Sequence, residues 1–200
     1  MTLATFPSSP IPPEHRAPIT VMIVDDQRAT RMGLSLIINR ADDLKVVAEA
    51  AHGQDALDRL AERIQERRPL PDVILMDVRM PHCDGLEAAR RILERDGERE
   101  VSEDERVRII MLTTFDIDEY VYSAVRAGAS GFLLKDTPPE QLLEAIRTVH
   151  RGDAVIAPSA TRRLLEHMIP VLDSPAPVAP VVPAIPPATG SELPLSLIHI

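Results

Sequence analysis

The chain has 200 residues, of which 44% are apolar and 26% are charged, so it can form one ordinary core domain with additional segments. Its formal net charge of −9 argues against a nucleic-acid-binding surface, which needs clustered basic residues, and its single cysteine, Cys83, excludes an internal disulfide framework. No apolar run approaches the roughly 20 residues of a membrane span, so we expect a soluble, cytoplasmic protein with no membrane partner.

Proline marks the ends of the folded part of the chain. Of the 19 prolines, 5 lie in residues 1–18 and 8 lie in residues 170–194. By composition, residues 1–18 are expected to form a disordered leader and residues 169–194 a linker rich in Pro, Ala and Val. The interval between them divides into a core over residues 19–137 and two helices within residues 138–168.

Between these tails, strand patterns and helix patterns alternate five times. The expected strands are Ile19–Val24, Leu44–Ala50, Val73–Met76, Arg108–Leu112 and Gly131–Leu134. The expected helices are Gln27–Arg40, Gly53–Glu66, Gly85–Arg95, Glu119–Ala127 and Pro138–His150, followed by an extra C-terminal helix over Ser159–Met168. Five successive β–α units predict an α/β fold with a doubly wound, five-stranded parallel sheet and helices on both faces.

Two of the expected strands end in aspartate. Asp25 and Asp26 follow the first strand, and Asp77 follows the third. In open α/β sheets, ligands bind beyond the carboxyl ends of the strands, so these carboxylates are expected to meet there. Three clustered carboxylates repel one another unless a cation such as Mg²⁺ binds between them. A carboxylate is also a competent phosphoryl acceptor.

Two further groups are expected at the same edge of the sheet. Thr113 ends the fourth strand with a hydroxyl that could bond a phosphoryl oxygen, and Lys135 follows the fifth strand with an ammonium that could pair with Asp77. Taken singly, the Asp pair could be a turn or a helix cap, and Thr113 an ordinary strand-end hydroxyl. The charged runs 59–68 and 96–106 are interpreted as solvated faces with helix ion pairs.

Five segments carry a family pattern: IVDD, MDVRMPHCDG, LTTFD, AGASGFLLKD and the later run EQLLEAIRTVHRGDAVIAPSATRRLLE. Together they resemble a response-regulator receiver domain of two-component signalling. The chain is more closely similar to the NarL/FixJ subfamily, in which the receiver precedes a LuxR-type helix-turn-helix. The resemblance covers residues 20–168 and implies a flavodoxin-like (CheY-like) sheet with strand order 2-1-3-4-5.

The resemblance also implies a role for each matching residue. Asp77 would be the phosphoacceptor, and Lys135 would be the amine that pairs with the phosphate. The Mg²⁺ ligands would be Asp25, Asp26, Asp77 and the backbone carbonyl of Arg79. Thr113 would be the switch hydroxyl, and Phe132 would be the aromatic residue that changes rotamer with it. On spacing alone, Phe132 fits a core position equally well.

The implied function is a phosphorylation-controlled switch and not an enzyme. A sensor histidine kinase would phosphorylate Asp77, the phosphorylated chain would form a homodimer, and promoter DNA would be bound only through a helix-turn-helix output domain that this chain lacks. The alternative is a stand-alone receiver that acts through protein–protein contacts. A phosphatase with an Asp nucleophile is disfavoured, because such enzymes generally need a second Asp where Arg79 stands.

The last residues of the chain bear on the missing output domain. Residues 195–200 can be encoded by a nucleotide string that resembles a transposon end used in sequencing-library adapters, so we expect a non-native tail there. An ordinary apolar terminus is the alternative.

Overall fold

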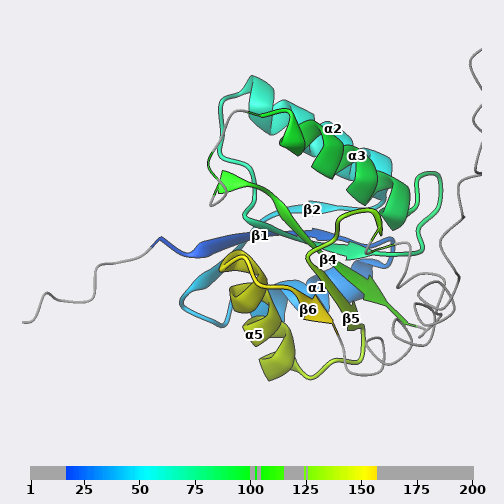
Figure 1. Cartoon of the computed structure of the whole chain (residues 1–200). Helices are drawn as coiled ribbons and strands as arrows, with labels where there is room; N and C mark the ends of the chain where they lie inside the picture. Colours follow the sequence, from blue (N-terminus) through cyan, green and yellow to red (C-terminus); the bar gives the residue numbers. More distant parts are fainter. Residues whose placement is uncertain (1–16, 100–101, 103–104, 115–123, 125, 157–200) are drawn as a thin grey trace, which may run out of the picture.

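A computed structural model of the chain describes residues 17–99, 102, 105–114, 124 and 126–156. Its strands form one sheet in the order β2-β1-β3-β4-β5-β6, and every pair is parallel (Figure 1). The strands are β1 (Ile19–Val24), β2 (Leu44–Ala50), β3 (Val73–Asp77), β4 (Arg108–Thr113), β5 (Gly131–Leu134) and β6 (Val155–Ile156). The helices are α1 (Arg28–Ile38), α2 (Gly53–Gln65), α3 (Gly85–Gly97) and α5 (Pro139–His150).

The predicted fold class and the strand order 2-1-3-4-5 are confirmed, and one strand is added to them. The short strand β6 follows α5 and continues the sheet beyond β5, pairing Phe132 with Ile156. Of the helix expected over Glu119–Ala127, only residues 124, 126 and 127 are described. The helix expected over Ser159–Met168 and both proline-rich tails lie outside the described residues.

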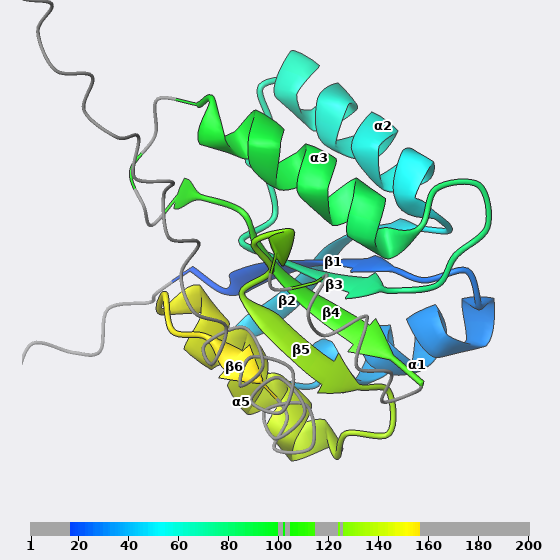
Figure 2. The ribbon, with the colours of Figure 1, turned by 45° about the vertical axis from the view of Figure 1, so that its right-hand side comes forward.

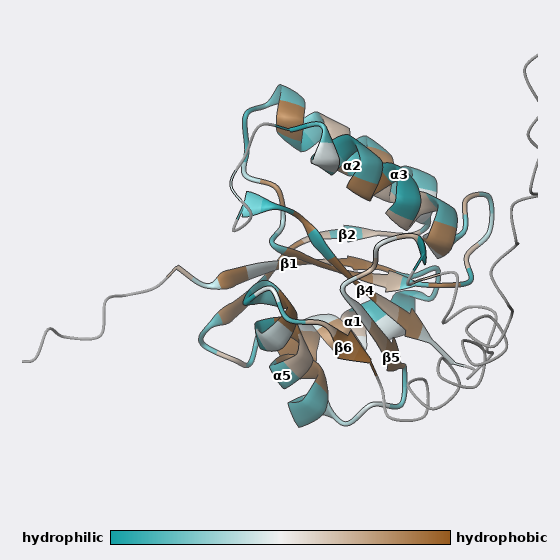
Figure 3. Ribbon diagram, viewed as in Figure 1, coloured by the Kyte–Doolittle hydropathy of each residue, from teal (hydrophilic) through white to brown (hydrophobic). Residues whose placement is uncertain are grey.

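Helices cover both faces of the sheet. Helices α2 and α3 lie on one face, and α1 and α5 lie on the other (Figure 2). Because side chains alternate along a strand, Met22 and Ile74 pack toward the first pair of helices, whereas Val21 and Leu75 pack toward the second. Apolar colour accordingly follows the strands, and hydrophilic colour the outer surfaces of the helices (Figure 3).

Local capping fixes where two helices begin next to the carboxyl edge of the sheet. The side chain of His52 accepts a hydrogen bond from the Asp55 amide at the start of α2, and the side chain of Asp84 accepts one from the Glu87 amide at the start of α3. Such caps satisfy amide groups that have no partner within the helix. Among the described helices, none is long and apolar enough to cross a membrane.

The approach of α3 to strand β3 is close. A Cβ atom placed on Gly85 would lie 1.9 Å from the backbone oxygen of Asp77, so only glycine fits at the first position of α3. The amide of Gly85 also donates to the carbonyl of Val78 at 2.9 Å. These contacts hold the loop after Asp77 against the end of its own strand.

The interpretation of residues 96–106 as a solvated run is wrong at Asp96. This side chain is buried, and its carboxylate accepts hydrogen bonds from the Val107 amide at 3.0 Å and from the Arg99 guanidinium at 2.5 Å. Asp96 therefore ties the end of α3 to the segment that enters β4. The physical reason is that the buried carboxylate is satisfied by a backbone amide and by the positive charge of Arg99.

Candidate functional site

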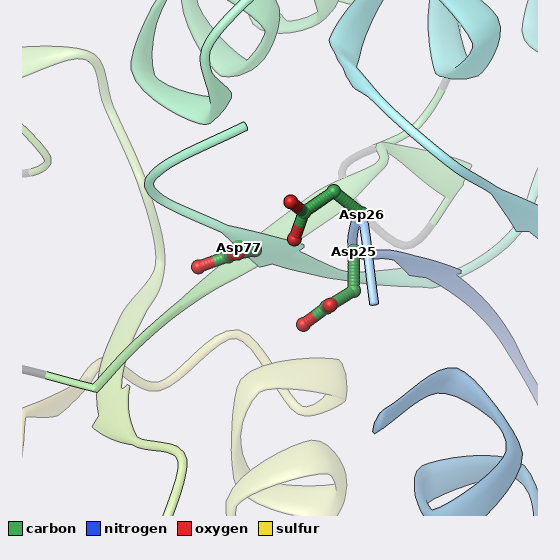
Figure 4. Close-up of side chains that lie close together, drawn as sticks. All are labelled: Asp25, Asp26 and Asp77. Atoms are coloured by element: carbon green, nitrogen blue, oxygen red, sulfur yellow. The ribbon is translucent and has the colours of Figure 1, made fainter. Parts of the chain in front are cut away.

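Three acidic side chains meet at the carboxyl edge of the sheet. Asp25 and Asp26 follow β1 directly, and Asp77 is the last residue of the neighbouring strand β3 (Figure 4). Because Val24 pairs with Met76, the register of the two strands brings Asp25 beside Asp77. One carboxylate oxygen from each of the three residues lies within 4.8 Å of the others. Asp25 and Asp77 are buried, whereas Asp26 is exposed.

Lys135 joins this cluster from β5, two strands away from β3. Its Nζ atom lies 2.6 Å from Oδ2 of Asp25 and 2.9 Å from Oδ2 of Asp77. The backbone of Lys135 is itself held, because its amide donates to the carbonyl of Thr113 at 2.8 Å. The ammonium thus bridges the two buried carboxylates.

The charges at this site do not cancel. Burial raises the pKa of Asp77, the ion pair with Lys135 opposes that change, and the negative charge of Asp25 adds to it. Burial lowers the pKa of Lys135, but its contacts with Asp25 and Asp77 outweigh burial, so the pKa of Lys135 is raised overall. The Lys135 ammonium pairs with two of the three clustered carboxylates, and a cluster with this excess of negative charge attracts a cation.

The ligand set fits a hard divalent cation. All three side chains offer oxygen, the donor that Mg²⁺ prefers. Oδ1 of Asp25 accepts from the Gln27 amide at 2.8 Å, whereas Oδ2 is buried and, among the described groups, meets only the Lys135 charge without a well-aligned hydrogen bond. Oδ1 of Asp77 accepts a long bond of 3.4 Å from the Arg79 amide. Weakly satisfied carboxylate oxygens are therefore available at the edge.

The two expected switch residues lie nearby but differ in their surroundings. Thr113 is buried at the end of β4, level with the same edge, and pairs in register with Leu134. Phe132 is buried in the core on the face covered by α2 and α3, and pairs with Met111. The structure thus shows Phe132 as a core residue in this state, and its role as a switch stays a prediction.

One residue at this site was not predicted from the sequence. Nη1 of Arg31, on α1, donates to the backbone oxygen of Asp25 at 2.7 Å. Arg31 is the fourth residue of α1, the helix that follows the acidic pair. Its acceptor is a backbone atom, which no residue pattern reveals.

A family model and a curated relative both match this chain, and the family match contains the site. Residues 21–147 match the family model of the response regulator receiver domain. The uncharacterized transcriptional regulatory protein YxjL of Bacillus subtilis (strain 168) is 45% identical over 137 residues, which are 68% of this chain and 56% of that protein. The chain therefore spans little more than half the length of this curated relative.

Solved structures agree with the family match. The crystal structure of a LuxR-family two-component response regulator from Aurantimonas sp. SI85-9A1 is 29% identical with a TM-score of 0.65, covering 76% of this chain and 99% of that chain. The crystal structure of the CheX-CheY-BeF3-Mg²⁺ complex from Borrelia burgdorferi is 25% identical with a TM-score of 0.56, covering 66% of this chain and 90% of that chain.

Proposed function

The chain belongs to the response regulator receiver domain family, in its NarL/LuxR-type branch, and from that premise we propose that it accepts a phosphoryl group on Asp77. The observation that carries this proposal is the bridge from Lys135 to both buried carboxylates, beside the exposed Asp26. Such a site can bind a cation and a phosphoryl group together, because the ammonium and the metal would share the negative charge of both.

The proposed transfer forms one bond and breaks one. A carboxylate oxygen of Asp77 attacks the phosphorus of a phosphohistidine on a sensor histidine kinase, the new P–O bond forms as the P–N bond breaks, and the imidazole nitrogen leaves with the electron pair and takes a proton from water. Asp77 must be ionised for this attack, and the ammonium of Lys135 at 2.9 Å favours that form. The residues of this chain thus position and stabilise charge more than they supply covalent chemistry.

Receiver domains bind Mg²⁺ at an acidic pocket, and we propose that this chain does so with Asp25, Asp26, Asp77 and the backbone carbonyl of Arg79. When bound there, Mg²⁺ would neutralise the oxygens of the incoming phosphoryl group. Asp25 and Asp77 are already held by Lys135, so the exposed Asp26 completes the site from the solvent side.

We propose that phosphorylation changes the contacts of the switch residues Thr113 and Phe132 and of Lys135. Once Asp77 carries a phosphoryl group, the ammonium of Lys135 and the hydroxyl of Thr113 gain new negative oxygens to bind, and Phe132 would repack in response. In the intact protein this change would promote a homodimer and control a transcriptional output domain that contacts promoter DNA. The relative from Bacillus subtilis, of which the matched segment is 56%, is described as a transcriptional regulatory protein.

Phosphorylation by a small donor tests the proposal. The chain is incubated with Mg²⁺ and acetyl phosphate, and the modified residue is mapped by mass spectrometry after reduction of the acyl phosphate with borohydride. We expect label on Asp77, loss of label in Asp77→Asn, and loss of label when Mg²⁺ is chelated. Asp136→Asn is the matched control, because Asp136 is an exposed acid next to Lys135. Label that persists in Asp77→Asn would contradict the proposal.

A further inference from the structure

Arg31, on helix α1, contacts the acidic site through the backbone of Asp25. Its Nη1 atom donates to the backbone oxygen of Asp25 at 2.7 Å, and its side chain is only 15% exposed although it carries a full charge. The oxygen that it binds belongs to the peptide group that joins Asp25 to Asp26. The orientation of that peptide group helps to set the direction in which both side chains leave the backbone.

The same guanidinium also contacts the edge strand of the sheet. Its Nε atom lies 3.6 Å from Oε2 of Glu49 on β2, and the amide of Asp25 donates to the carbonyl of Ala50, the next residue of that strand, at 3.2 Å. The backbone of Asp25 is therefore held on both sides, by the amide bond to β2 and by the carbonyl bond to Arg31. Arg31 spans helix α1, the acidic pair and strand β2.

We infer that Arg31 is a positioning residue for the metal-binding acidic pair: its guanidinium fixes the Asp25–Asp26 peptide group and thereby holds both carboxylates ready for Mg²⁺. This inference rests on the proposed function. Arg31 donates to a backbone atom and would not touch the metal. Groups that orient metal ligands from outside the ligand shell commonly control affinity by about 10- to 100-fold.

A general effect of charge is the other way in which an Arg31 substitution could change Mg²⁺ affinity. Removing a positive charge near a cation site would in fact strengthen cation binding through simple Coulomb attraction. The positioning role of Arg31 predicts the opposite change, because loss of the guanidinium would release the Asp25–Asp26 peptide group and so weaken Mg²⁺ binding. The two explanations can therefore be separated by the direction of the effect alone.

The experiment uses the whole chain and Mg²⁺ alone as the ligand. Mg²⁺ affinity is measured by calorimetry or by amide chemical-shift titration for wild type, Arg31→Met, Arg31→Lys and Arg28→Met. Arg28 is an exposed arginine on the first turn of the same helix, so its replacement gives the same change in net charge. Circular dichroism establishes that each variant is folded before it is titrated.

We expect Arg31→Met to weaken Mg²⁺ binding about tenfold, Arg31→Lys to fall between it and wild type, and Arg28→Met to stay within about twofold of wild type. With acetyl phosphate, the half-saturating Mg²⁺ concentration should rise for Arg31→Met while the maximal rate at saturating Mg²⁺ stays within about twofold. The guanidinium donates to the carbonyl of Asp25, which is bonded to the amide nitrogen of Asp26, so the ¹⁵N shift of that amide should change in both Arg31 variants.

Three results would overturn the inference. These are Arg31→Met binding Mg²⁺ as tightly as wild type or more tightly, Arg28→Met losing as much affinity as Arg31→Met, or Arg31→Lys matching wild type. The last comparison decides the matter even if Arg31→Met does not fold, because lysine keeps the charge and loses the forked donor. Failure of wild type itself to bind Mg²⁺ and accept phosphate would instead refute the proposed function.

Discussion

The carboxyl group of Asp77 lies where its charge is disfavoured. Burial and the charge of Asp25 raise its pKa, and the ion pair with Lys135 compensates only in part. A carboxyl group whose pKa is higher in the folded than in the unfolded state makes folding less favourable as the pH rises from its unfolded value, and the full penalty is reached above its folded value. Functional sites commonly hold such unfavourable arrangements at the expense of stability.

Replacing this charge should therefore stabilise the fold. We expect Asp77→Asn to raise the free energy of unfolding by about 1 kcal/mol at neutral pH without Mg²⁺, because the amide removes a buried charge that Asp25 also repels. Below the ordinary Asp value of 3.8 the difference should vanish, since Asp77 is then protonated in both the folded and the unfolded state. Urea unfolding at the two pH values measures the effect.

The exposed Asp136 again supplies the control, because its replacement removes the same charge outside the cluster. Asp136→Asn should change the free energy of unfolding by less than about 0.5 kcal/mol. A destabilised Asp77→Asn at neutral pH would show that the bridge to Lys135 outweighs burial and repulsion, contrary to this account.

At the scale of the elements, the strands that end at the site were the most predictable. Strand β3 could be placed to within one residue, because a buried parallel strand is a continuous apolar run and Asp77 ends it. The order of charged groups along the chain then placed Asp25, Asp77 and Lys135 at one edge. Parallel strands deliver their carboxyl ends to the same side, so their meeting follows from topology alone.

Other elements carry no pattern that sequence reasoning can use. Strand β6 has two residues, too few to show any periodicity, and it forms because the chain leaving α5 passes beside the open edge of β5. Asp96 stands in a run of charged residues, and only the fold reveals that its partner is the Val107 amide. Arg31 likewise acts on a backbone oxygen, which leaves no trace in residue types.

The junction made by Asp96 gives a prediction at this scale. We expect Asp96→Ala to lower the free energy of unfolding by about 2 kcal/mol, because it leaves the buried Val107 amide without its acceptor and removes the partner of Arg99. Glu94→Ala on the same helix should cost less than about 0.5 kcal/mol, since Glu94 is exposed and only pairs with Arg90. Chemical denaturation compares the two variants.

Hydrogen exchange would localise the loss. In Asp96→Ala the amides at the start of β4 should exchange faster, whereas those of β1, on the other side of β3, should follow only the global change in stability. An Asp96→Ala variant as stable as Glu94→Ala would mean that water or another group replaces the carboxylate, and that the α3–β4 junction does not depend on Asp96.

For the whole molecule, the net charge of −9 complicates any test of a specific cation site. Any added salt screens the mutual repulsion of the acidic groups and so favours the compact state. Mg²⁺ bound at the proposed site would add a further stabilisation that saturates, reaching about 2.7 kcal/mol when its concentration is 100 times its dissociation constant. Only the saturable part reports on the site.

Thermal unfolding with Mg²⁺, set against NaCl at equal ionic strength, separates these two contributions. We expect Mg²⁺ to raise the melting temperature of wild type well beyond NaCl, and the excess to disappear in Asp26→Asn. Asp26 is the suitable residue to change because it is exposed, so the variant loses a proposed ligand without leaving a buried group unpaired. An equal response to both salts, or an excess that survives in Asp26→Asn, would mean that the cation acts on the acidic surface as a whole and that the edge of the sheet holds no Mg²⁺ site.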